Sequence, residues 1–233
     1  MKRVFAILLL TVIALGFAAG CSGNKSINDV NYPPKVTETP PPEEIPSLSE
    51  QAGLENKKAA PYIDAFARRT FYLKYSIEMA YYDQTVKTIT EVAAMGGEIS
   101  IKNSVGFVDT ADTVSLDNTE GLTVYKENKA FSIDHKNKTV TVTPSSLQIS
   151  TMFPDSGYIF EESGLAELFG ISYNYEDYYT NSIDLRFYFD ENKLVGLERL
   201  TSNMTPMLVL EMSTDIPAGI FDIPAEYTVL EGK

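Results

Sequence analysis

The stretch FYLKYSIEMAY, residues 71–81, decides the fold class of this chain. Large apolar side chains alternate in it with other residues, so that Lys74, Ser76 and Glu78 fall on the opposite face. A period of two residues is that of an extended strand with one buried face. The apolar row comprises Phe71, Leu73, Tyr75, Ile77, Met79 and Tyr81. We therefore predict an antiparallel strand that is buried on one side.

The residues after this stretch predict an antiparallel meander. Gly96 and Gly97 form a turn between two segments rich in Val, Ile and Thr. Further on, the polar connections contain Asn128 and Asn137, and Asn tolerates the positive φ that tight hairpins require. The strands predicted here span residues 85–95, 98–107, 122–125, 130–133 and 139–142.

Two short helices and a second group of strands complete the expected fold. Pro61 favours the first position of a helix over 61–67, and Gly170 favours the end of a helix over 163–170. The later strands are expected at residues 183–189, 194–200 and 204–212. The fold class is therefore mainly β, a curved antiparallel sheet packed on a few short helices.

The N-terminus has the features of a bacterial export signal. Two basic residues precede an apolar run at 4–14, which is short for a transmembrane span, and small residues then lead to Cys21. Ala19, Gly20 and Cys21 resemble the lipobox of lipoproteins, although Ala18 stands where Leu is usual. We expect residues 1–20 to be a signal peptide and Cys21 to be lipidated. The alternatives are plain secretion and an uncleaved N-terminal anchor.

Composition divides the remaining chain into a stalk and a folded domain. Residues 21–60 are polar and rich in Pro, which predicts a disordered or polyproline stalk, and residues 61–233 are rich in apolar and aromatic residues. Loss of Lys2 and Arg3 with the signal peptide changes the formal net charge from −13 to −15. Such a charge repels nucleic acid. We expect an extracytoplasmic protein, held by lipid at the outer leaflet of the cell membrane or at the outer membrane.

Residues for catalysis or metal binding are sparse, so we expect no enzyme activity, no cofactor and no metal. His135 is the only histidine and falls in a predicted turn. The acidic pairs Glu161-Glu162 and Glu176-Asp177 could serve as acid and base, but sequence neighbours do not report a separation across a cleft. We expect these carboxylates to be solvated.

Two groups of side chains are candidates for binding. Apolar strand residues form either an ordinary core or the lining of a cavity for acyl chains, in which Met204 and Met212 would adapt to the ligand. The proposed ligand-binding residues are Phe71, Leu73, Tyr75, Ile77, Met79, Ile99, Ile101, Phe107, Leu208 and Leu210. The second group, expected in a loop, comprises Tyr173, Tyr175, Tyr178 and Tyr179 with Asn174 and Asn181. It could stack on sugars, bind a protein or simply cover the sheet edge.

The order of these elements resembles the LolA/LolB-like superfamily of lipoprotein carriers. The resemblance covers most of residues 61–230 and is specific at Phe221-Asp222-Ile223-Pro224 and Tyr227, a segment that also fits an ordinary packed C-terminus. It implies an incomplete β-barrel around helices with an apolar cavity. We therefore expect a membrane-anchored protein that binds an acyl chain or another apolar ligand. The alternative is a sensor or interaction module for an envelope protein or glycan that uses the tyrosines.

Overall fold

A computed structural model describes the part of the chain that forms the folded domain. The described residues are 47–51, 53–81, 84–108, 114–147, 149, 153–181, 183–200 and 205–232. They all belong to a compact unit that begins at Pro46. Cys21, the expected signal peptide and Met204 lie outside them. None of the helices in the described ranges has both the length and the apolar character needed to cross a membrane.

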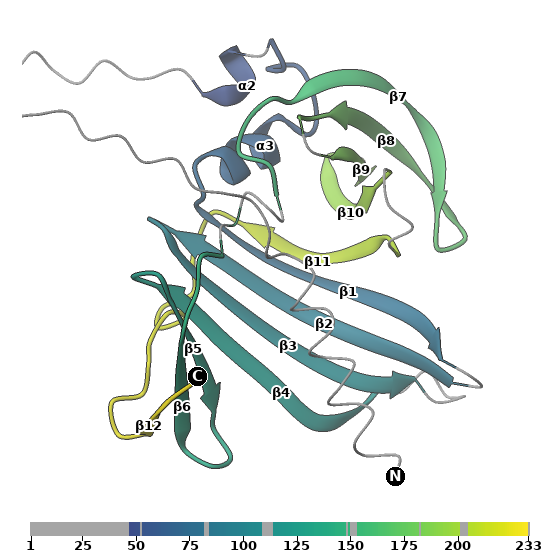
Figure 1. The fold of residues 1–233 in the computed structure, drawn as a ribbon. Coiled ribbons are helices and arrows are strands. Elements are labelled where there is room, and N and C mark those ends of the chain that lie inside the picture. The colour runs from purple at the N-terminus through teal and green to yellow at the C-terminus, as the bar shows by residue number, and fades with distance from the viewer. Residues whose placement is uncertain are drawn as a thin grey trace, which may run out of the picture. The chain divides into compact units, whose positions relative to one another are not determined.

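The described residues form one open sheet (Figure 1). Its strands are β1 (Phe71–Tyr81), β2 (Gln84–Met95), β3 (Glu98–Val108), β4 (Val114–Lys126), β5 (Lys129–Asp134), β6 (Thr139–Pro144), β7 (Ile159–Leu168), β8 (Ile171–Tyr179), β9 (Asp184–Asp190), β10 (Lys193–Arg199), β11 (Met207–Ser213) and β12 (Thr228–Glu231). Two antiparallel meanders, β1 to β6 and β7 to β11, join where β1 pairs with β11. The predicted class, mainly β with a curved sheet that does not close, is confirmed.

Two tight turns of the first meander follow the predicted turn chemistry, whereas in the turn between β5 and β6 the positive φ falls at Lys138 and not at Asn137. Gly96 and Gly97 both have positive φ, as do Glu127 and Asn128. Two consecutive residues with positive φ make the turn type whose twist matches a β-hairpin. The strands expected on both sides of these turns are confirmed.

The helix predicted over residues 163–170 is wrong, because this segment forms most of β7 and the turn into β8. Gly164 pairs with Tyr175, and a Cβ added at Gly164 would lie 3.1 Å from that ring. Because Gly164 has no side chain, the Tyr175 ring can pack directly on the strand at this position. Such packing of an aromatic ring on a glycine stabilises sheets. Cross-strand packing outweighs the helix preference of the Leu-Ala-Glu-Leu run.

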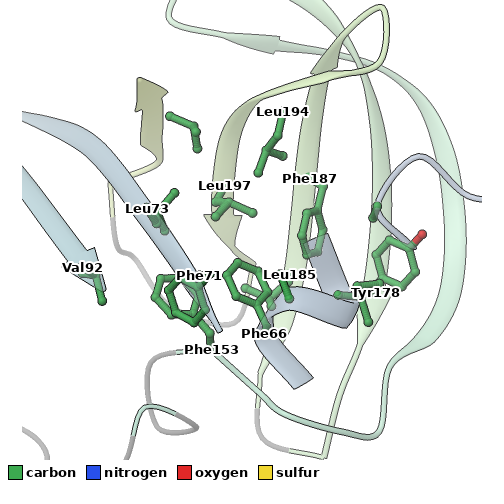
Figure 2. Close-up of a cluster of buried hydrophobic side chains, with 14 of the residues drawn as sticks. Phe66, Phe71, Leu73, Val92, Phe153, Tyr178, Leu185, Phe187, Leu194 and Leu197 are labelled. Atoms are coloured by element: carbon green, nitrogen blue, oxygen red, sulfur yellow. The ribbon is translucent and has the colours of Figure 1, made fainter. Parts of the chain in front are cut away.

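Two short helices, α2 (Leu48–Gln51) and α3 (Ala60–Ala67), lie on the side toward which β7 to β10 curve (Figure 1). The helix predicted over 61–67 is thus confirmed. Phe66 of α3 is 1% exposed; its ring stacks on Phe153 at 4.7 Å and meets Phe71 edge-on at 5.0 Å (Figure 2). Leu54 and Ala59 are buried in the same cluster. Packing therefore begins before residue 61, where the sequence had placed the end of the stalk.

A second core lies on the other face of the sheet, contrary to the prediction that β1 is buried on one side only. Tyr72 is 6% exposed and packs in a cluster with Val124 and Phe221, against which Ile223 and Tyr227 also lie. The segment from Phe221 to Tyr227 is therefore packed on the sheet, which agrees with the interpretation of it as an ordinary packed C-terminus. It continues into β12, an unpredicted strand that pairs in parallel with β6.

Two buried tyrosines predict loss of stability in alkaline solution. Burial raises the pKa of Tyr158 and of Tyr178, and a hydrogen bond to Glu176 adds to the effect for Tyr178. An unfolded tyrosine has a pKa of about 10, so this stability is fully present below pH 10 and is lost as the pH rises. We expect the free energy of unfolding to fall by about 1.4 kcal/mol per buried tyrosine between pH 9 and pH 11. Urea unfolding at both pH values measures it; an unchanged pH dependence in Tyr158→Phe would contradict it.

Candidate functional site

The face of the sheet that packs on α3, called here the helix-facing face, carries the predicted ligand-binding row of β1. Residues paired across strands share a face, so the register of β1 to β4 defines rows across it. From the start of β1 outward, the rows are Phe71 with Ala94, Ile99 and Tyr125; Leu73 with Val92, Ile101 and Thr123; Tyr75 with Thr90, Asn103 and Gly121; Ile77 with Thr88 and Val105; and Met79 with Val86 and Phe107.

Burial decreases steadily from the first row to the last. Phe71 and Leu73 are 0% exposed and Tyr75 is 8% exposed, whereas Met79 is half-buried and Phe107 is 37% exposed. At β1 and β2, the first two rows therefore belong to the closed core. The last two rows form what we call the outer apolar patch, made of Ile77, Met79, Val86, Val105 and Phe107.

A polar row separates the core from the outer apolar patch. Thr90 is buried, and its hydroxyl donates to Oδ1 of Asn103 at 2.8 Å. Tyr75 lies beside Thr90 in the same row, and burial raises the pKa of its phenol. The helix-facing face thus changes from apolar to polar and back to apolar along the strands.

The structure gathers only some of the predicted ligand-binding residues around this patch. Ile77, Met79 and Phe107 belong to it, and both Ile77 and Ile101 also pack against the core. The core itself contains Phe71, Leu73, Tyr75 and Ile99, with Met212 against it. Leu208 pairs with Ser76 and so faces the other side, while Leu210 lies in an irregular step of β11 and is 40% exposed. The side chain of Tyr81 lies outside the described residues.

Val86 and Val105 belong to the outer apolar patch but were not predicted as site residues. Gly96 and Gly97 form a two-residue turn, and this fixes the register so that Val86 pairs with Phe107. Counting back from that turn would have found Val86.

Surface hollows lie away from the outer apolar patch. One of about 460 Å³ is lined by Lys58, Leu165, Asn174 and Phe189 among others, and one of about 710 Å³ lies beside β12. Neither of these two hollows includes a residue of the patch.

Glu176 is buried, so the expectation that it is solvated is wrong. Its carboxylate accepts hydrogen bonds from the backbone N–H of Lys58 at 3.1 Å, the N–H of Ala59 at 3.0 Å and the hydroxyl of Tyr178 at 2.8 Å. These amides precede α3, where a helix start leaves donors without partners. Glu176 therefore fastens the start of α3 to β8.

Asp177 points to the opposite face of β8 and is also buried, at 3% exposure. Both of its oxygens accept from Arg186 at 2.7 Å, and this pairing raises the pKa of the guanidinium. Arg186 also lies 4.0 Å from the ring centre of Tyr175. Burial and a hydrogen bond to Glu198 raise the pKa of Tyr188 to about 12. Both carboxylates of the pair Glu176-Asp177 are therefore bonded to groups of the protein itself, and they hold the fold together.

The tyrosine group lies on strand β8 and not in a loop. Tyr178 is 0% exposed and belongs to the core, next to Phe187. Tyr173 and Tyr175 are half-buried and Tyr179 is 44% exposed, all on the other face. Asn174 and Asn181 are exposed. The four tyrosines therefore do not form one surface.

The remaining candidates are exposed, as predicted. His135 is exposed in the turn between β5 and β6, with its Nδ1 2.9 Å from the hydroxyl of Tyr227. Glu161 and Glu162 are exposed on β7. In the described ranges, no three His, Cys, Asp or Glu side chains come together as metal ligands would.

No family model matches the chain, and no curated protein matches it either. Among solved structures, an uncharacterized conserved protein from Thermus thermophilus is similar over 75% of this chain and 99% of its own, with 10% identity and a TM-score of 0.36.

Proposed function

We propose that this chain is a membrane-anchored extracytoplasmic lipoprotein that binds an acyl chain or another apolar ligand on the helix-facing face of a LolA/LolB-like half-barrel. The observation that carries the proposal is the outer apolar patch. It continues the rows of the core beyond the polar row, and its large side chains remain partly exposed, with Phe107 at 37%. Binding, and not catalysis, is the activity that such a surface supports.

The chemistry of the patch fits an unbranched hydrocarbon. Each methylene that leaves water is worth up to about 0.8 kcal/mol, and the unbranched side chain of Met79 adapts to irregular shapes. The two rows of the patch are about 7 Å apart along the strands. The half-buried Asn103 at its inner end has amide N–H donors that could bond to the polar end of a lipid. Lipidation of Cys21 accounts for the membrane attachment in this proposal.

The test combines lipid analysis with two substitutions. Native mass spectrometry of the protein purified from its own host should detect a bound lipid. A fluorescent fatty acid should bind saturably, and Met79→Asp and Phe107→Asp should each weaken binding about tenfold, because each puts a charge in the apolar contact. Met95→Asp is the matched control, since Met95 is 45% exposed and pairs with Glu98 on the opposite face of the same hairpin. If no lipid co-purifies and no saturable site is found, the proposal fails.

A second candidate, contact with an envelope protein or glycan, is favoured by a partly exposed row of tyrosines on β8. Tyr173, Tyr175 and Tyr179 share one face of that strand. Since Tyr178 belongs to the core, the variant that separates the two functions replaces Tyr173 and Tyr175 by Ala. Unchanged fatty-acid uptake with lost retention of an envelope component would favour this second function.

A further inference from the structure

The strand β7 is an open edge of the sheet, which Figure 1 shows at the outer rim. It pairs with β8 on one side, and the described residues supply no strand on its other side. Every residue from Glu161 to Leu165 is exposed, although their side chains alternate between faces. Both faces and the edge of this segment are therefore open to a partner.

Acidic and apolar side chains mark this edge chemically. Residues 159–179 contain no Lys or Arg, and Glu161, Glu162 and Glu167 are exposed. The large apolar residues exposed on the hairpin are Ile159 at 60%, Leu165 at 71%, Phe169 at 50% and Ile171 at 56%. These side chains lie on both faces along the hairpin, so a strand added to β7 could cover apolar surface on either face.

The hairpin is held in place before any partner arrives. Leu168 near its tip is 2% exposed, and a Cβ added at Gly196 would lie 2.4 Å from the side chain of Leu168. The leucine therefore occupies the space that a larger residue at position 196 would fill. Closer to its start, the Lys57 ammonium lies 3.2 Å from the centre of the Phe160 ring. An edge ordered in advance loses less entropy on binding.

We propose that β7 binds an extended segment of a partner protein, rich in basic and apolar residues, by strand addition. An edge strand presents unpaired N–H and C=O groups, which give affinity to an added strand. On one face of β7 the added strand would meet Ile159 and Glu162, and the exposed Glu161 lies between them, where the register with β8 shifts. On the other face it would meet Leu165 and Glu167. The acidic charge selects a basic segment.

The same charge argues against a second copy of this chain as the occupant. Two β7 strands placed edge to edge would bring their glutamates together, and like charges across strands are destabilising. The charge of β7 therefore disfavours pairing with a second β7 strand and favours pairing with a basic strand.

The experiment uses the full-length chain purified in mild detergent and a labelled, capped peptide of Lys-Val-Val-Lys repeats, which carries both residue types on each face. Fluorescence anisotropy should show saturable binding that weakens as salt is added. The variant Glu161→Lys with Glu167→Lys should bind at least about tenfold more weakly. The control Glu226→Lys with Glu231→Lys makes the same change in net charge at exposed positions elsewhere and should bind like the wild type. A peptide with Pro in place of two Val residues should not bind, since Pro cannot donate to a strand pair.

Hydrogen exchange locates the contact. Amides of residues 159–168 should gain protection on peptide binding, whereas the other edge strand, β12, should not. Absence of saturable binding, equal binding by the Pro peptide or by the Glu161→Lys/Glu167→Lys variant, or protection at β12 instead of β7 would each overturn the proposal. So would a wild-type dimer, seen by sedimentation, that forms through β7.

Discussion

Replacing Phe66 by Ala is expected to lower the free energy of unfolding by about 3–5 kcal/mol. The ring is 1% exposed and touches the rings of Phe71 and Phe153, which belong to other parts of the chain. Its removal leaves a cavity where α3 meets the sheet, and neighbouring rings cannot collapse fully into it. Urea unfolding followed by circular dichroism measures the loss.

Phe107→Ala is the matched control, because it makes the same chemical change at a ring that is 37% exposed. We expect less than half the loss of stability there, since less apolar surface leaves water at that site on folding. Equal losses in the two variants would contradict the burial gradient along the helix-facing face.

Replacing Glu176 by Ala is expected to cost about 3–5 kcal/mol as well, because buried donors lose their partner. The change removes the acceptor for the N–H groups of Lys58 and Ala59 and for the hydroxyl of Tyr178. A buried donor without a partner costs about 1–3 kcal/mol. Faster hydrogen exchange at these two amides, together with the urea midpoint, would show that the start of α3 has come loose.

Two controls separate this effect from a general loss of charge. Glu176→Gln keeps the shape and one acceptor oxygen, so it should lose less stability than the Ala variant. Glu161→Ala removes a carboxylate that is exposed on β7 and should change stability by less than about 0.5 kcal/mol. If Glu176→Ala unfolds like the wild type, the fastening of α3 to β8 is not a source of stability.

The hairpins could be predicted from the sequence, because their turn residues and the two-residue period of their strands both involve residues that are close together in the chain. Gly96 and Asn128 have the positive φ that their residue types favour. The segment of β7 was missed because Ala, Glu and Leu favour a helix, while the decisive partner, the Tyr175 ring on Gly164, lies on the next strand.

Features that depend on distant segments could not be predicted. The second core needs Phe221 against Tyr72, and nothing near either residue in sequence indicates that contact. Burial of Glu176 likewise depends on amides more than a hundred residues earlier in the chain. The row of β1 was predicted correctly as a face, but how far α3 covers it became visible only in the structure.

The junction of β1 with β11 has a consequence for how the chain folds. Each meander is built from neighbours in sequence, so its hairpins form quickly and independently. β1, however, finds its second partner only when Ser213 arrives to pair with Tyr72. Closing so long a loop is entropically costly and therefore slow. Until synthesis reaches that point, one side of β1 remains an open edge, and the half-formed sheet is vulnerable to aggregation.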